Sequence, residues 1–268
     1  MTSPWLPVTV TTQRARSTGD LQQVGVQQVI VAEQLCESVA VRAGEHLLDV
    51  AAGTGNAAIA AARRYAEVVA VDAAPELLEH ARTRAQAEGV RVHTQVADVQ
   101  DLPFADGRFD VVLSSFGAMF VPDQRRTAAE MARVCRRGGR IGLACWTPDG
   151  LFGQQLSIIA DFRGGPDGLP SPTRWGTEDG LRELFGDQLI DLTVRRRAVF
   201  TAYRSAQHYL QLWGRWFVPM AALLGTLSPE DLVAFRHQIT ELVWRYNRAG
   251  DDTLLVFSAY LEAMLTRR

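Results

Sequence analysis

Short apolar runs alternate with helical patterns along the middle of the chain. Five runs predict strands: residues 46–50 (HLLDV), 67–72 (EVVAVD), 90–98, 108–115 and 138–146. The first three are separated by two helical segments, 57–66 and 75–89, the second with proline in its first turn and glycine at its end. Because strands that alternate with helices need crossover connections, this pattern predicts a doubly wound α/β sheet of mostly parallel strands.

Further elements flank this region on both sides. Apolar residues near helical spacing predict a helix over residues 20–39 that covers one edge of the core. After residue 146 we predict helices at 151–160 and 176–186, a sixth strand at 195–203 and an antiparallel seventh at 253–265, with about 50 mostly helical residues between these two strands. The predicted organisation is an N-terminal arm and cover helix (1–40), a seven-stranded domain (41–204 and 250–268) and a helical insertion before the last strand (205–249).

The residues that follow the first two strands are suited to bind a ligand, because ligands of such sheets lie outside the carboxyl ends of the strands. The small residues of AAGTGN (51–56) allow a sharp turn and a close approach of the backbone before a helix begins. Asp72, 23 residues after Asp49, can accept hydrogen bonds from both hydroxyls of a ribose. The run GTGNAA (53–58) also fits the dinucleotide pattern G-x-G-x-x-A, so this loop leaves two adenine-containing cofactors open.

Composition and charge exclude several classes of protein. The 268 residues carry a net charge of −2 at a pI of about 6.2, which disfavours nucleic acid and membrane surfaces as partners. All 28 basic residues are arginine, so a Schiff-base lysine and a catalytic Tyr-Lys pair are both excluded. Three distant cysteines suggest neither a disulfide framework nor a metal site. The N-terminus lacks a signal pattern and no apolar run approaches about 18 residues, so we expect a cytoplasmic protein.

The longer motif order distinguishes between the two cofactors. The chain reads D-x-A-x-G-T-G (49–55), V-D (71–72), D-x-x-x-L-P-F (98–104), F-D-x-V (109–112) and R-x-C-R-x-G-G-R (133–140). Over residues 45–147 this order resembles the class I S-adenosylmethionine-dependent methyltransferases, in particular the type 11 and ubiquinone/menaquinone-biosynthesis enzymes. The resemblance implies a Rossmann-like methyltransferase fold, S-adenosyl-L-methionine as cofactor and S-adenosyl-L-homocysteine as its product.

The resemblance also implies which residues hold the cofactor. Gly53 and Gly55 would contact the methionine part, Asp72 the ribose, and Asp98 with the backbone of Val99 the adenine. The two serines that end the fourth strand would lie beside the sulfonium and amino group, and Asp49 would support the glycine loop. The full set is Asp49, Ala51, Gly53, Gly55, Asp72, Ala73, Asp98, Val99, Ser114 and Ser115. Each acid has a structural alternative, as a turn or helix cap or a solvated loop carboxylate.

Two departures from the family pattern concern the glycine loop and the acceptor side. Ala51 stands where many relatives have the first glycine. Met119 and Phe120 stand where many members have one or two histidines, so a family-style base is absent there. The apolar lining that remains, which includes Phe116, would suit a hydrophobic or aromatic acceptor. The alternative is that these side chains belong to the core.

The insertion at 205–249 is the predicted substrate lid. Its Trp213 and Trp216 are candidates for the acceptor pocket, although a helical hairpin or a homodimer interface would bury the same residues. His208 is the one histidine whose position could face the site as a general base, and its default role is that of a surface helix residue.

We therefore predict a methyltransferase that acts on an oxygen, nitrogen or carbon of a small molecule, without nucleic acid or membrane as partner and without a metal. An acceptor that arrives ionised would need no base. The alternatives are an NAD(P)-dependent oxidoreductase and a methyltransferase-like protein that binds the cofactor without transferring methyl.

Overall fold

The computed structural model describes residues 24–164 and 170–268, and its centre is one seven-stranded sheet. The strand order is β3-β2-β1-β4-β5-β7-β6. Strands β1 to β5 pair in parallel, and β7 is antiparallel to both β5 and β6. The predicted doubly wound, mostly parallel sheet is confirmed. The strands are β1 His46–Val50, β2 Glu67–Asp72, β3 Val92–Val96, β4 Phe109–Ser115, β5 Cys135–Trp146, β6 Leu189–Tyr203 and β7 Leu254–Arg267.

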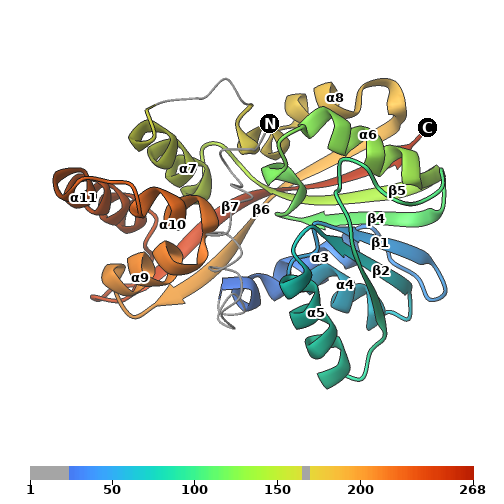
Figure 1. Ribbon diagram of the computed structural model, residues 1–268, viewed down its shortest axis with the longest axis horizontal. Helices are drawn as coiled ribbons and strands as arrows, with labels where there is room; N and C mark the ends of the chain where they lie inside the picture. The colour runs from blue at the N-terminus through green and yellow to red at the C-terminus, as the bar shows by residue number, and fades with distance from the viewer. Residues whose placement is uncertain (1–23, 165–169) are drawn as a thin grey trace.

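Helices cover both faces of the sheet (Figure 1). One face carries α3 (Val29–Ser38), α4 (Asn56–Ala62) and α5 (Pro75–Ala87), and the other carries α6 (Gln124–Val134) and α8 (Glu178–Phe185). Helix α5 begins at its proline, and the Asp123 and Thr177 side chains cap α6 and α8 by accepting from backbone N–H groups. Five-residue β1 is buried from its second position onward, as expected for a central parallel strand.

A second lobe of helices lies at the far end of β6 and β7. It contains α9 (Ala206–Trp216), α10 (Val218–Leu224) and α11 (Pro229–Arg245) from the predicted insertion, together with α7 (Leu151–Phe162). The two long strands run from the sheet into this lobe (Figure 1). An edge-to-face contact between Phe162 and Phe235, at 5.4 Å between ring centroids, joins α7 to α11. The helices of the insertion are therefore connected directly to β6 and β7, two strands of the central sheet.

Some element bounds differ from those predicted. Strand β6 begins at Leu189 rather than 195, because it pairs with β7 almost to the end of the chain. Strand β5 begins at Cys135 rather than 138. Helix α4 ends at Ala62, four residues early, and the chain turns at Tyr65 with φ of 61°. Short 3-10 helices stand at η1 (Val26–Gln28), η2 (Ala118–Phe120), η3 (Pro172–Gly176) and η4 (Gly186–Gln188). The predicted arm (1–19) and the start of the cover helix near Asp20 lie outside the described residues.

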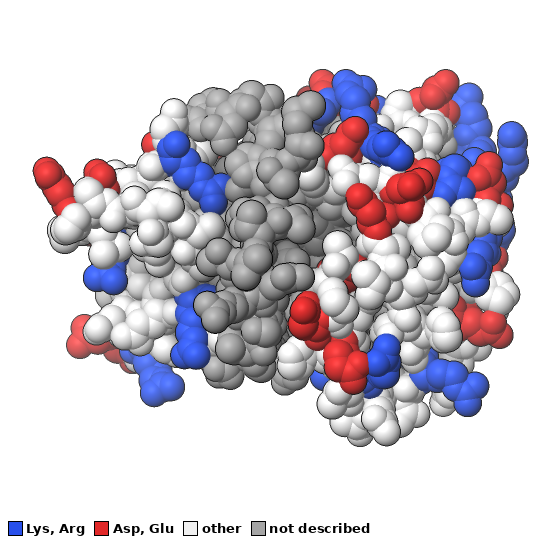
Figure 2. Space-filling view, in the orientation of Figure 1, with Lys and Arg blue, Asp and Glu red and all other residues white. Residues whose placement is uncertain are grey.

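The surface mixes charges of both signs. Arginine and acidic side chains are interspersed over the face shown in Figure 2, and no large area of one sign stands out. Within residues 24–164 and 170–268, no helix has the length and apolar character needed to cross a membrane. The same ranges contain no group of three or more His, Cys, Asp or Glu side chains that could hold a metal ion.

Candidate active site

The strand order reverses between β1 and β4, and the loops that follow these two strands meet at the carboxyl edge of the sheet. This is the position where doubly wound folds bind their ligands. The loop after β1 spans residues 51–55, and the loop after β4 begins at Phe116. At Gly117 an added Cβ would stand only 2.7 Å from the Ala51 Cβ. The two loops therefore pack directly against each other, and glycine is needed at that contact.

The loop after β1 has an unusual backbone. Ala51, Gly53 and Gly55 all have positive φ, at 53°, 56° and 84°. A Cβ on Gly55 would lie 2.8 Å from the Ala81 Cβ on α5, whereas a Cβ on Gly53 would meet nothing within 4 Å. Gly55 is thus required by packing, and Gly53 exposes its backbone to open space. Ala51 adopts a conformation that favours glycine, at a cost on the order of 1 kcal/mol.

Two buried acids support this loop. The Asp49 carboxylate, 1% exposed, accepts a hydrogen bond from the Ala58 N–H at 2.8 Å. The Asp72 carboxylate accepts from the Gly53 N–H and from the Ala74 N–H, each at 2.9 Å. Burial, opposed by the hydrogen bond from the Ala58 N–H and assisted by the nearby Asp72 charge, raises the pKa of Asp49 to about 7. Two buried carboxyl groups of different proton affinity thus lie beneath an open glycine loop.

The acids predicted for the ribose and adenine occupy the ends of β2 and β3. Asp72 is the last residue of β2, with Ala73 exposed directly after it. Asp98 is exposed beyond β3, and its carboxylate accepts from the Gln100 backbone N–H at 2.9 Å, as in an Asx turn. Val99 beside it is buried. All four residues lie at the same edge of the sheet as the glycine loop.

The two serines that end β4 have different surroundings. The buried Ser114 hydroxyl donates to the Val50 carbonyl at 2.8 Å and accepts from the Ala118 N–H at 3.0 Å. It therefore joins the end of β1 to η2. Ser115 is only half-buried. Ser114 holds the two loops together, a role that the sequence did not reveal.

A continuous series of aromatic rings begins at the end of β4. Phe116, which has a positive φ of 61°, stacks on Trp146 at 3.8 Å between centroids and 9° between ring planes. Trp146, the last residue of β5, contacts Phe152 at 4.2 Å, and Phe152 contacts Trp213 of α9 at 4.6 Å. A non-glycine residue with positive φ is costly and occurs preferentially at functional sites. The series connects the strand ends to the helical lobe.

The chain of ring contacts continues from α9 to η2. Trp213 contacts Phe217 at 5.6 Å, and Phe217 contacts Phe120 at 6.0 Å. We call the six residues Phe116, Trp146, Phe152, Trp213, Phe217 and Phe120 the aromatic series. Met119 is buried beside it in η2, and the buried Trp216 ring carries the Arg215 guanidinium at 4.6 Å. Trp146 and Phe152 were missed from sequence, although the position of Trp146 at a strand end was a usable signal.

His208 lies at the start of α9. Its Nδ1 accepts from the Arg204 N–H at 3.2 Å, and its ring is 6.0 Å from that of Tyr203. The side chain thus supports the turn between β6 and α9. Tyr203 in turn accepts from the Trp213 indole N–H at 2.9 Å, which fixes the orientation of that ring.

Proteins with similar sequences or structures include named methyltransferases and proteins of uncharacterised function. A family model described as a methyltransferase domain matches residues 47–139. A Mycobacterium tuberculosis protein of uncharacterised function is 40% identical over 219 residues, 79% of each chain. Demethylmenaquinone methyltransferase of Clavibacter sepedonicus is 45% identical over 104 residues, 39% of this chain and 42% of that protein. The structure of a geranyl diphosphate methyltransferase in complex with SAM matches with a TM-score of 0.55 and 20% identity, covering 99% of this chain and 94% of that one.

The fold and the glycine loop define a Rossmann-like protein with a ligand site at its topological switch point. The chain belongs to the class I S-adenosylmethionine-dependent methyltransferases of the type 11 kind. The cofactor is S-adenosylmethionine, which resolves the choice that the glycine loop alone left open. The residues present fit this cofactor, because a ligand can approach the Gly53 backbone from its open side and the carboxylate of Asp72 at the end of β2 is an acceptor group suited to ribose hydroxyls.

Proposed function

We propose that the protein methylates an oxygen, nitrogen or carbon atom of a small apolar or aromatic acceptor. The observation that carries this proposal is the aromatic series, which begins directly after β4 at the switch point and includes side chains of the helical lobe. Flat apolar rings and aromatic edges favour a planar or hydrophobic ligand. Two similar proteins are named for demethylmenaquinone and geranyl diphosphate as acceptors, and both molecules suit such a lining.

We assign the cofactor contacts to the loops at the switch point. Gly53 and Gly55 would face the methionine part, and Asp72 would face the ribose. The Gly53 and Ala74 N–H groups each donate to one Asp72 oxygen, which orients this carboxylate at the end of β2. Asp98 and Val99 would face the adenine. Ala51, Ala73 and Ser115 would line the same edge, with Asp49 and Ser114 supporting it from behind.

The chemistry needs little beyond positioning. The cofactor supplies a methyl group on a positively charged sulfur, which is already electrophilic. The protein must hold the acceptor atom in line with the methyl–sulfur bond at about 3 Å and exclude water. The aromatic series, of which four members are buried and Phe120 and Phe217 are half-buried, can do both. The Nδ1 of His208 is engaged with the Arg204 backbone, so we propose an acceptor that arrives ionised and needs no base; a neutral acceptor would release its proton to solvent after methyl transfer.

We propose that the insertion, residues 205–249, forms the cover of the acceptor. Trp213 and Phe217 of this segment enter the aromatic series, while Trp216 packs beside them. Met119, Phe120 and Phe116 would line the side nearer the cofactor.

Transfer of a radiolabelled methyl group to a panel of acceptors tests the proposal. The panel should contain phenols, aromatic carboxylic acids, demethylmenaquinone, geranyl diphosphate and, as polar controls, free amino acids. We expect label on an apolar or aromatic member, and Trp213→Ala should raise its KM at least tenfold. Trp244→Ala removes a tryptophan that is 41% exposed on α11 and outside the aromatic series, so it should leave KM unchanged. Label only on the amino acids would refute the proposed acceptor class.

A further inference from the structure

We infer that Arg84 of α5 positions the glycine loop and thereby sets the affinity for S-adenosylmethionine. Its Nη1 donates to the Thr54 carbonyl at 2.6 Å, to the Asn56 side-chain oxygen at 2.8 Å and to the Thr54 hydroxyl at 3.2 Å. The guanidinium is half-buried beside the loop, which lies 28 to 30 residues earlier in the chain. The inference rests on the cofactor of the family and not on the identity of the acceptor.

The contact falls at the part of the loop that most needs support. The Thr54 carbonyl lies between Gly53 and Gly55, whose φ angles are both positive. Glycine has little intrinsic backbone preference, so a loop that combines such residues keeps one shape through its hydrogen bonds. Asp72 accepts from the Gly53 N–H, and the Gly55 N–H donates to the Ala52 carbonyl at 2.9 Å within the loop. Arg84 binds the carbonyl of the same Thr54–Gly55 peptide group and so fixes its orientation from the side of α5.

Helix α5 provides a matching surface for the loop. Ala81, one turn before Arg84, stands where a Cβ on Gly55 would lie 2.8 Å away. A small residue at 81 lets the loop approach, and Arg84 then binds the approaching backbone. The two positions are three residues apart, so they share one face of the helix. This face defines where the loop can lie.

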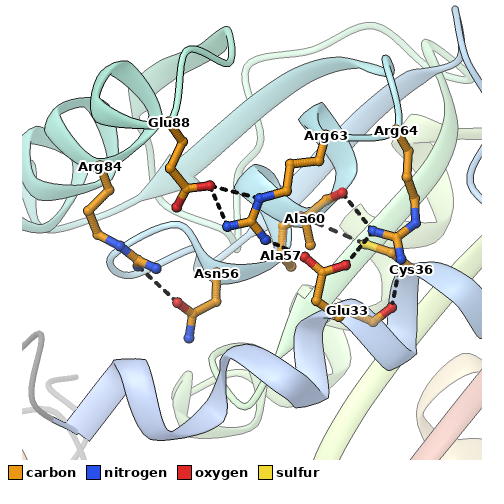
Figure 3. A network of polar contacts seen from close by, with 9 residues as sticks. All are labelled: Glu33, Cys36, Asn56, Ala57, Ala60, Arg63, Arg64, Arg84 and Glu88. Carbon is orange, nitrogen blue, oxygen red and sulfur yellow. Dashed lines mark hydrogen bonds and ion pairs between the residues drawn. The ribbon is translucent and has the colours of Figure 1, made fainter.

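Asn56 extends the contact to the segment before α3. Its side-chain oxygen accepts from Arg84, as Figure 3 shows, and its nitrogen donates to the Gly25 carbonyl at 2.8 Å. A Cβ on Gly25 would lie 3.0 Å from the Thr54 hydroxyl oxygen. The glycine loop thus lies between α5 and Gly25, and Arg84 contacts both Thr54 in the loop and Asn56 at the start of α4.

A second ionic connection offers a matched control. Arg63 of α4 pairs with Glu33 of α3 and with Glu88 at the end of α5, and Arg64 also pairs with Glu33 (Figure 3). These pairs connect α3, α4 and α5 to one another through Glu33 and Glu88 and do not involve residues 51–55. Arg63→Ala therefore removes helix-to-helix pairing, whereas Arg84→Ala removes the hold on the loop.

Calorimetric titration with S-adenosylhomocysteine tests the inference on the full chain. We expect Arg84→Ala to raise the Kd at least tenfold, with a ligand-free melting temperature close to that of Arg63→Ala. Arg84→Lys should recover much of the affinity, because an ammonium group can still donate to the Thr54 carbonyl. Arg63→Ala should bind within twofold of the unaltered protein. Once an acceptor is known, Arg84→Ala should raise the KM for the cofactor with little change in kcat.

Two results would overturn the inference. One is an Arg84→Ala protein that binds within twofold of the unaltered chain. The other is equal weakening by Arg63→Ala, which would show that helix docking and not the loop contact matters. If Arg84→Ala does not fold, Arg84→Met, which keeps an unbranched side chain but has no hydrogen-bond donor, decides the question, and unchanged affinity in that variant would refute the role. Failure of the unaltered protein to bind S-adenosylhomocysteine would instead contradict the cofactor assignment itself.

Discussion

The rings of Phe116 and Trp146 lie parallel, 3.8 Å apart, at the ends of the adjacent strands β4 and β5. Phe116 keeps a left-handed backbone conformation at this position, and its N–H donates to the Ala144 carbonyl at 2.8 Å. The stack and this hydrogen bond offset the cost of that conformation. The stacked pair thus forms a fixed surface at the carboxyl ends of β4 and β5, where we propose that the acceptor binds.

Removal of Trp146 should destabilise the protein strongly. The side chain is 3% exposed and contacts Phe116 and Phe152, so Trp146→Ala should lower the free energy of unfolding by about 3–5 kcal/mol. Trp244→Ala, at a 41% exposed position, should cost less than about 1 kcal/mol. Urea unfolding of the two variants measures the difference, and similar losses would argue against a packed aromatic series.

Loss of the Ser114 hydroxyl should lower the stability of the fold more than loss of the Ser115 hydroxyl. Ser114→Ala leaves the Val50 carbonyl and the Ala118 N–H without their buried partner, which should cost about 1–3 kcal/mol. Ser115 is half-buried and the same change there should cost less than about 0.5 kcal/mol. Thermal unfolding of both variants provides the comparison. Equal effects would mean that Ser114 does not hold the two loops together.

The two glycines of the loop should respond differently to alanine. Gly55→Ala adds a methyl 2.8 Å from the Ala81 Cβ at a φ of 84°, so it should reduce folding stability by more than about 2 kcal/mol. Gly53→Ala meets only open space and carries the backbone cost of about 1–2 kcal/mol. Its methyl would however occupy the side on which we place the cofactor. Gly53→Ala should therefore remain folded and lose at least tenfold in affinity for S-adenosylhomocysteine, measured by calorimetry; retained affinity would place the cofactor elsewhere.

Asp49 should make the ligand-free protein less stable as the pH rises. Its pKa of about 7 in the folded chain exceeds the ordinary value of 3.8, so the folded state binds the proton more tightly than the unfolded state. The resulting stabilisation is complete below pH 3.8 and is lost as the pH rises through 7, by up to about 4 kcal/mol.

Urea unfolding at pH 5.5 and pH 8, with Asp49→Asn as the reference, isolates this contribution. The unaltered protein should lose more stability between the two pH values than Asp49→Asn does. Other groups titrate in both proteins and cancel in the comparison. The same pH dependence in both would show that Asp49 does not titrate in this range.

The central fold was predictable because buried parallel strands have a strong sequence signature. The apolar runs at 46–50 and 67–72 coincide with β1 and β2, and Pro75 coincides with the first residue of α5. The start of β6 was not predictable in the same way. Residues 189–194 alternate between exposed and half-exposed positions at the edge of the sheet, and their pairing with the end of β7 is a long-range contact.

The candidate site likewise contains residues that could be predicted from the sequence and residues that could not. Gly53, Gly55 and Asp72 lie at or just after strand ends, and their place at the carboxyl edge of the sheet could be predicted from local sequence and motif order. Phe152 joins the aromatic series through the packing of α7 against the insertion, Phe217 through its contact with Phe120 of η2, and Arg84 reaches the glycine loop across 30 residues. Such juxtapositions depend on tertiary structure, and no local pattern encodes them.

The long pairing of β6 with β7 has a mechanical consequence. After one register shift near Leu189, the two strands stay paired from Asp191 to Tyr203, from the edge of the sheet into the helical lobe. A ribbon whose backbone hydrogen bonds are continuous resists bending, so the lobe and the sheet should move as one rigid body. The shape of a preformed site, rather than the closure of a mobile cover, would then determine which acceptor binds.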